Sequence, residues 1–75
     1  MIVIHSKRVL LISFSRRLKS VRTQRNLSQK EVAILCKMDF SSYANIENGK
    51  RNITLFTLHR ILSILDISFK EFFDY

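Results

Sequence analysis

The chain has 75 residues, a formal net charge of +7, and 47% hydrophobic and 25% charged residues. This length corresponds to one small domain, and this balance of residues excludes a disordered chain. The single cysteine, Cys36, excludes an internal disulfide and a cysteine-rich zinc site, and no apolar run approaches the ~18 residues of a membrane span. We therefore expect a reduced, cytoplasmic protein that does not enter a membrane.

Positive charge is concentrated in the first half of the chain. The bases that precede the first acid, Glu31, are Lys7, Arg8, Arg16, Arg17, Lys19, Arg22, Arg25 and Lys30. A half of the chain whose charged residues are all basic indicates an anionic partner, either nucleic acid or a membrane surface. The alternative is a solvated basic face that binds nothing.

The first helix is predicted from three apolar residues that recur at helical intervals with bases between them: Phe14, Leu18 and Val21. It is expected to end near Asn26, because asparagine tolerates a left-handed stop. Its start is open. Residues 1–13 are either an apolar and basic arm or the start of this helix, and residues 14–75 form the domain.

The second and third helices are predicted to lie close together in the chain. The sequence SQKE at residues 28–31 is a capping box that opens the second helix, which runs to about Cys36. Asp39 suits the N-cap of the third helix, which runs to Asn48 and stops at Gly49. Two short helices joined by so tight a turn predict a helix-turn-helix.

Two further helices complete the expected fold. Thr54 is a good N-cap for the fourth helix, whose predicted apolar face comprises Leu55, Leu58, Ile61, Leu62 and Leu65. Ser68 and Glu71 form a second capping box, which opens the fifth helix. Proline is absent and glycine occurs once, which favours helices joined by short turns. The sequence therefore predicts an all-α, compact five-helix domain.

The stretches LKSVRTQRNLSQKEVA (residues 18–33) and IENGKRN (residues 46–52) resemble the lambdoid phage repressor and Cro family, or Xre-type helix-turn-helix regulators. Within that family, the run DFSSY…ENGKRNIT is most similar to controller proteins of restriction-modification systems. The resemblance implies a lambda-repressor-like fold and double-stranded DNA as the partner. It also implies a homodimer whose two recognition helices enter successive major grooves of a pseudo-palindromic operator.

Carried over residue by residue, the resemblance assigns the recognition helix to residues 39–48. It implies base reading by Phe40, Ser41, Ser42 and Asn45. It implies phosphate binding by Gln29, Asn48, Lys50 and Arg51, and a buried ion pair between Arg22 and Glu47. An uncharged helix face followed by two basic residues, Lys50 and Arg51, suits DNA binding. Short polar and apolar side chains read the edges of nucleobases, while lysine and arginine mostly bind phosphates.

Several of these roles have alternatives. Phe40 stands where the family usually has a polar or basic residue, so it either contacts a thymine methyl group or packs against the protein. Ser41 and Ser42 are equally suited to local bonds at a helix start. Gln29 stands at the start of the second helix, where any polar residue is ordinary.

Besides Phe40, four residues depart from the family pattern. Lys37 replaces the usual turn glycine, and a left-handed backbone there costs about 1 kcal/mol. Ile34, Leu35 and Phe56 stand where the family is usually polar. We expect the apolar run MIVI, residues 1–4, to cover Ile34 and Leu35, either in its own subunit or in the partner subunit.

The expected function is that of a sequence-specific transcriptional regulator, with activation and repression both open. We expect the homodimer contact at Phe56, Ile67, Phe69 and Phe72, and the alternative is that all four lie in the core. The rival function is a protein-interaction module, such as an antitoxin that neutralises a partner protein. Neither the histidines nor the acids show metal or catalytic spacing, so we expect no enzyme activity, metal, cofactor or small-molecule ligand.

Overall fold

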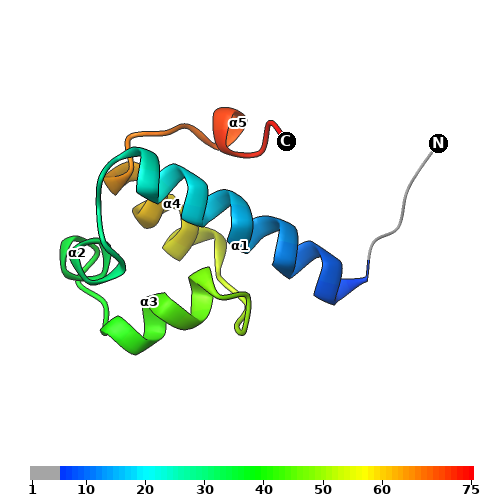
Figure 1. Ribbon diagram of the computed structural model, residues 1–75, viewed down its shortest axis with the longest axis horizontal. Helices are drawn as coiled ribbons and strands as arrows, with labels where there is room; N and C mark the ends of the chain where they lie inside the picture. Colours follow the sequence, from blue (N-terminus) through cyan, green and yellow to red (C-terminus); the bar gives the residue numbers. More distant parts are fainter. Residues whose placement is uncertain (1–5) are drawn as a thin grey trace.

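The structure is a computed structural model that describes residues 6–75. Over this range the chain forms five helices (Figure 1): α1 (Lys7–Gln24), α2 (Gln29–Leu35), α3 (Phe40–Glu47), α4 (Leu55–Ile64) and α5 (Phe69–Phe72). The predicted all-α, five-helix fold is confirmed. No helix among these residues is long and apolar enough to cross a membrane.

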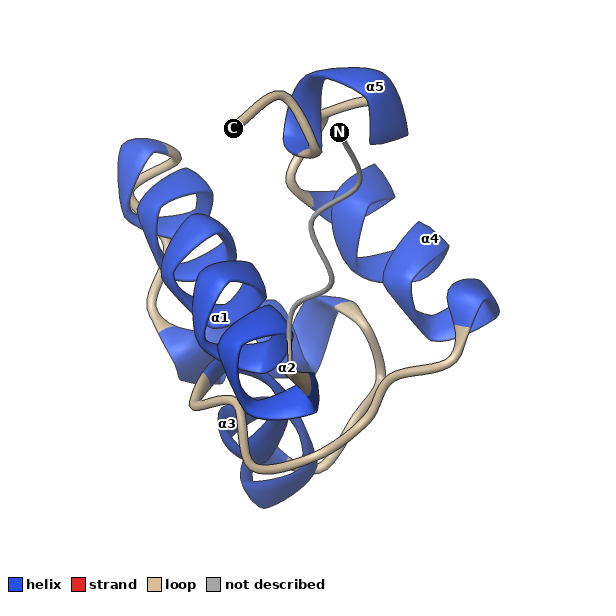
Figure 2. Cartoon of the chain, turned by 90° about the vertical axis from the view of Figure 1, so that its right-hand side faces the viewer, coloured by secondary structure: helices blue, strands red, loops and turns tan. Residues whose placement is uncertain are grey.

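Helix α1 is the longest element, and it contacts both α3 and α5. In Figure 1, α3 lies below α1 and α5 lies above it, so the two short helices occupy opposite sides of the molecule. Helix α4 contacts α2 and α5, and it runs beside α1 across the core, as Figure 2 shows from the side. The helix-turn-helix pair, α2 and α3, therefore forms one end of the domain.

Hydroxyl side chains set the start of most helices. Ser6 Oγ accepts a hydrogen bond from the Val9 N–H at 3.2 Å and caps α1. The hydroxyl groups of Ser28, Thr54 and Ser68 cap α2, α4 and α5 in the same way. Residues 7–13 thus lie in α1 rather than in an arm. Asp39 holds the N-cap position of α3, but its side chain makes no capping bond.

The core lies where α1, α4 and α5 meet the helix-turn-helix pair. Its fully buried large side chains are Leu18, Val21, Val32, Tyr43, Ile61, Leu62, Leu65 and Phe72. The prediction that Leu55 faces inward is wrong, because Leu55 is 73% exposed in the first turn of α4, where the helix extends past the core.

The expected role of Phe72 in a dimer contact needs correction. Its side chain is 0% exposed, and its ring lies against those of Phe14 and Phe73, with centroids 5.6 and 4.9 Å away. A side chain that is fully enclosed within one protomer offers no surface to a partner. Phe72 is therefore a core residue. The expected cover of Ile34 and Leu35 by residues 1–4 lies outside the described residues, and both side chains are exposed.

Four of the described residues take a left-handed backbone, each just after a helix: Asn26, Lys37, Gly49 and Asp66. Lys37 does so with φ 55°, so it takes the left-handed conformation that is costly for a residue with a Cβ atom. At Gly49 the constraint is also spatial, because a Cβ atom would lie 3.3 Å from the Leu11 carbonyl oxygen. The loop after α3 therefore packs directly on the backbone of α1.

Three arginines tie the helices together through backbone carbonyl groups. Arg17 donates to the carbonyl oxygens of Glu71 and Phe72 at 2.8 Å, and Arg25 donates to that of Leu65 at 2.7 Å. Arg60 donates to the carbonyl oxygen of Cys36. Carbonyl groups at helix C-termini have no partner within the helix, so these guanidinium groups satisfy them.

Candidate nucleic-acid interface

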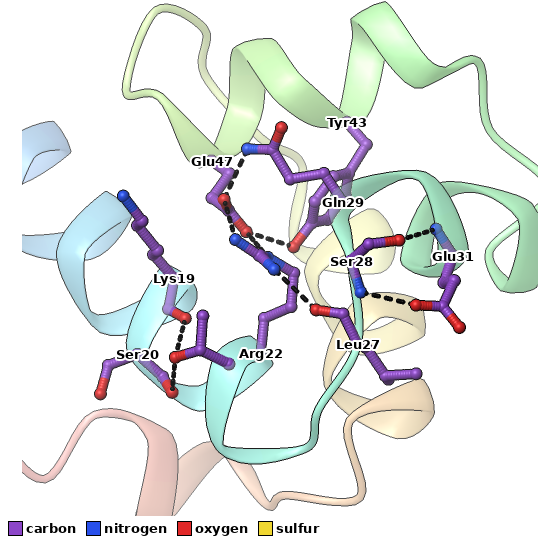
Figure 3. A network of polar contacts seen from close by, with 10 residues as sticks. Lys19, Ser20, Arg22, Leu27, Ser28, Gln29, Glu31, Tyr43 and Glu47 are labelled. Carbon is purple, nitrogen blue, oxygen red and sulfur yellow. Dashed lines mark hydrogen bonds and ion pairs between the residues drawn. The ribbon is translucent and has the colours of Figure 1, made fainter.

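A buried carboxylate anchors the end of α3 to α1 and α2 (Figure 3). Glu47 Oε1 accepts from Arg22 Nε at 2.6 Å and from the Tyr43 hydroxyl at 2.9 Å. Its Oε2 accepts from Arg22 Nη2 at 3.0 Å and from Gln29 Nε2 at 2.6 Å. The structure thus contains the predicted buried pair of Arg22 and Glu47, and it joins Gln29 and Tyr43 to the same group.

The charges of this network are fixed by their surroundings. Burial raises the pKa of Glu47, but the hydrogen bonds from Arg22, Gln29 and Tyr43 outweigh it, and the net pKa lies below the ordinary value. The hydrogen bond to Glu47 raises the pKa of Arg22, and burial raises that of Tyr43. The carboxylate, guanidinium and neutral phenol are therefore the stable forms at neutral pH.

This network orients the outer face of α3. Because Tyr43 and Ile46 are buried, the other sides of the helix face outward. Ser41 and Asn45 are exposed, Ser42 is half-buried, and Phe40 is 53% exposed. The four predicted base-reading residues thus form one uncharged surface, on which the ring of Phe40 faces solvent.

The predicted phosphate-binding residues lie around this surface. Asn48, Lys50 and Arg51 are exposed on the loop that follows α3, and the Lys50 N–H donates to the Asn45 carbonyl oxygen at 2.9 Å. Gln29 is half-buried at the start of α2, where its amide nitrogen braces Glu47. Three of the four residues are therefore free to turn toward a ligand, while Gln29 is already engaged through its amide nitrogen.

The fold also brings together residues that sequence reasoning left apart. Lys37, in the turn between α2 and α3, lines an open hollow with Asp39, Ser42 and Arg51. This places a third basic side chain, besides Lys50 and Arg51, near the outer face of α3. No sequence period could have revealed it, because Lys37 and Arg51 lie in two separate loops.

Tyr43 is a residue to which sequence reasoning gave no role. Its hydroxyl group in fact belongs to the Glu47 network, and the spacing of the two residues is the available signal. Residues four apart on a helix lie on the same face, where a phenol can reach a carboxylate.

Comparisons with known proteins agree with this architecture. A family model described as helix-turn-helix matches residues 18–72. The chain is 40% identical to the control protein C.MunI of Mycoplasma sp over 64 residues, which span 84% of this chain and 86% of that protein. It is 34% identical over 59 residues to the HTH-type transcriptional regulator PuuR of Escherichia coli, of which it spans 32%.

Two solved structures share the fold. The restriction-modification controller protein C.AhdI from Aeromonas hydrophila matches with a TM-score of 0.82 and 35% identity, covering 87% of this chain and 98% of that one. A point mutant of the restriction-modification controller protein C.Esp1396I matches with a TM-score of 0.80 and 29% identity, covering 87% of this chain and 82% of that one.

Proposed function

The chain belongs to the helix-turn-helix family of DNA-binding transcriptional regulators, and we propose that it binds a pseudo-palindromic operator as a homodimer through the major groove. The two recognition helices, one from each protomer, enter successive major grooves about one DNA turn apart. A cytoplasmic location suits this role, because the protein must reach its DNA.

The observation that carries the proposal is the uncharged outer face of α3, which has the exposed basic residues Lys50 and Arg51 beside it. Phe40, Ser41, Ser42 and Asn45 supply donors, acceptors and one apolar ring, which are the groups that distinguish base edges. Asn45 is the strongest candidate, because an asparagine amide can bond adenine with two hydrogen bonds. The Phe40 ring contacts thymine methyl groups and favours A/T at that step.

The contacts with the DNA backbone come from the residues around this face. Lys50 and Arg51 pair with phosphates on the strand beside the recognition helix, and Asn48 adds a neutral hydrogen bond. Gln29 donates one N–H of its side-chain amide to Glu47 and the second N–H to a phosphate. These contacts set register and affinity, and the outer face of α3 sets sequence preference.

The homodimer contact is proposed for Phe56, Ile67 and Phe69. Phe56 is 71% exposed, and it lines one shallow hollow with Phe69, Leu55 and His59. Exposed apolar side chains that gather on one face of a small domain are typical of an interaction surface. Leu55 joins the proposed interface, and Phe72 is excluded because it is buried.

The biological setting is proposed from the relatives. C.MunI is a control protein, and C.AhdI and C.Esp1396I are controller proteins of restriction-modification systems. We propose that this chain also regulates transcription in such a system, by covering a promoter or by recruiting polymerase from an upstream site.

The proposal is tested by fluorescence anisotropy on a duplex that the protein selects from a randomised pool, and on a scrambled duplex of equal length. A sequence-specific regulator binds the selected duplex at least ~1000-fold more tightly than the scrambled one. Equal affinities that fall together as salt is added would mean that positive charge alone holds the DNA, and would overturn the proposal.

The second candidate is a protein-interaction module such as an antitoxin. It is favoured by Ile34 and Leu35, which are 64% and 51% exposed on α2. Co-purification of a second chain that is lost in the variant Ile34→Ser/Leu35→Ser would support it. Retention of that chain by the variant would exclude this surface.

A further inference from the structure

We propose that Lys7 and Arg8, at the start of α1, are additional DNA-backbone contacts that extend the interface beyond the helix-turn-helix unit. Both residues lie outside residues 18–72, the part of the chain that the family model matches. The proposal rests on the proposed phosphate contacts of the loop after α3.

The first observation is that α1 begins beside this loop. Gly49 packs so closely on α1 that a Cβ atom there would lie 3.3 Å from the Leu11 carbonyl oxygen and 3.4 Å from Ser15 Oγ. Figure 1 shows the first turns of α1 continuing past the loop that joins α3 to α4. The start of α1 is therefore held on the same side of the molecule as the loop.

The second observation is a shared hollow. Lys7 and Arg8 line an open hollow together with Asn48 and Gly49. Asn48 is one of the proposed phosphate ligands, and Lys50 and Arg51 follow directly. Successive phosphates of one strand rise by only about 3.4 Å along the helix axis. A strand that passes Lys50 and Arg51 thus brings neighbouring phosphates within reach of Lys7 and Arg8.

The third observation is that Lys7 and Arg8 are not engaged by carboxylates within the described residues. Both side chains are exposed, and within residues 6–75 neither forms an ion pair with a carboxylate. The first turn of α1 contains no acid. Arg17, Arg22 and Arg25, further along the same helix, are instead bound to groups of the protein itself. Lys7 and Arg8 are thus available to an external anion.

DNA phosphate is the anion that we assign to this position, because Lys7 and Arg8 share a hollow with Asn48, a proposed phosphate ligand. Lys7 and Arg8 lie beside the loop after α3, which carries the proposed phosphate ligands, whereas the proposed base-reading face belongs to α3. Their contribution should therefore be equal for every DNA sequence and sensitive to salt. This distinguishes them from Asn45, whose contribution should depend on sequence.

The test compares two double variants of the full chain that lose the same charge. Lys7→Gln/Arg8→Gln removes the proposed contacts. Arg16→Gln/Lys70→Gln removes one lysine and one arginine that are exposed elsewhere: Arg16 lines a hollow with Tyr75, and Lys70 lies on α5, opposite α3. Affinity is measured by fluorescence anisotropy on the selected duplex and on a random-sequence duplex, over a range of salt concentrations.

We expect the slope of log affinity against log salt to flatten, on both duplexes, by about 0.9 for each phosphate that Lys7→Gln/Arg8→Gln no longer neutralises. Because each protomer of the proposed homodimer loses two contacts, four phosphates are affected, and the advantage of the wild type over this variant should shrink about 150-fold between about 50 and 200 mM salt. The variant Arg16→Gln/Lys70→Gln should keep the wild-type slope. Thermal unfolding followed by circular dichroism checks that both variants keep the fold.

Equal slopes for the two double variants would overturn the inference, because the net charge alone would then account for both. This outcome is distinct from failure of the proposed function. If the wild type does not prefer the selected duplex, sequence-specific regulation fails, while the slopes on the random duplex still decide the role of Lys7 and Arg8.

Discussion

Arg22 and Glu47 are joined by two parallel hydrogen bonds, from Nε to Oε1 at 2.6 Å and from Nη2 to Oε2 at 3.0 Å. A bidentate pair of this kind fixes orientation as well as distance. It therefore sets the rotation of α3 about its own axis, and with it the direction in which the outer face of that helix points.

Replacement of Glu47 by alanine should unfold the domain rather than affect DNA binding alone. Removing one partner of a buried ion pair leaves an uncompensated charge and typically costs roughly 3–5 kcal/mol. Urea denaturation should show this loss for Glu47→Ala and almost none for Asp74→Ala, an exposed acid near the C-terminus. An unchanged unfolding midpoint together with abolished DNA binding would contradict the prediction.

The same carboxylate should make stability fall in acid. The pKa of Glu47 in the folded state lies below its ordinary value of 4.5, so its stabilising contribution is complete above about pH 4.5. The contribution is lost as the pH falls through the lower folded-state pKa, with a slope of up to about 1.4 kcal/mol per pH unit for one proton. Chemical denaturation at a series of pH values measures this slope.

The variant Glu47→Gln should be less stable than the wild type at pH 7, yet its stability should vary less with pH below about 4.5. Asp74→Asn serves as the matched control and should keep the wild-type slope. If Glu47→Gln and the wild type lose stability in parallel below this pH, another group is responsible for the acid sensitivity.

Lys37→Gly should stabilise the protein. Lys37 has φ 55°, a left-handed conformation that costs a residue with a Cβ atom about 1 kcal/mol and costs glycine little. Part of this gain is offset by the greater freedom of glycine in the unfolded chain, so we expect about 0.5 kcal/mol from chemical denaturation. Lys37→Ala removes the same charge but keeps the Cβ atom, and an equal gain in that variant would refute the backbone explanation.

Asn45→Ala should reduce selectivity without reducing stability. Removal of a bidentate contact with adenine costs about 1–3 kcal/mol of discrimination, which should appear as weaker binding to the selected duplex only. Lys50→Gln should instead weaken binding to the selected and random duplexes together, because a phosphate contact carries no sequence information. An Asn45→Ala variant with unchanged selectivity would remove Asn45 from the reading face.

Phe56→Ser should dissociate the proposed homodimer while the protomer stays folded, because Phe56 is exposed at the start of α4. Sedimentation velocity measures the change in mass. Ile34→Ser, which removes an exposed apolar side chain on α2, should leave the dimer intact. If both variants remain dimeric and bind DNA, the interface lies elsewhere on the surface.

Most helix starts could be predicted because their signals are local. The N-caps Ser28, Thr54 and Ser68 lie at the starts of α2, α4 and α5, as predicted. The predicted capping box is complete at Ser28, whereas at Ser68 the Glu71 carboxylate accepts from the Ser68 hydroxyl group. The helix-turn-helix resemblance is confirmed by the family match, and it also located the pair of Arg22 and Glu47.

Burial at the ends of short helices could not be predicted in the same way. A four-residue helix is too short for its period to show whether Phe69, Phe72 or Phe73 faces inward, and only Phe72 is fully buried. Leu55 follows the helical period of α4, yet it lies one turn beyond the core. The bonds from arginine side chains to distant carbonyl groups have no sequence period at all.

The arginines that bind carbonyl groups or Glu47 have a consequence for the charge of the chain. Arg17, Arg22, Arg25 and Arg60 act as cross-links between helices, so four of the 13 lysine and arginine residues are already engaged within the protein. The bonds to neutral carbonyl groups leave the charges of Arg17, Arg25 and Arg60 in place, but these guanidinium groups are already engaged, so fewer cations can bond phosphates directly than the count of 13 indicates. In a domain this small, arginine side chains both hold the helices together and supply the proposed contacts with DNA.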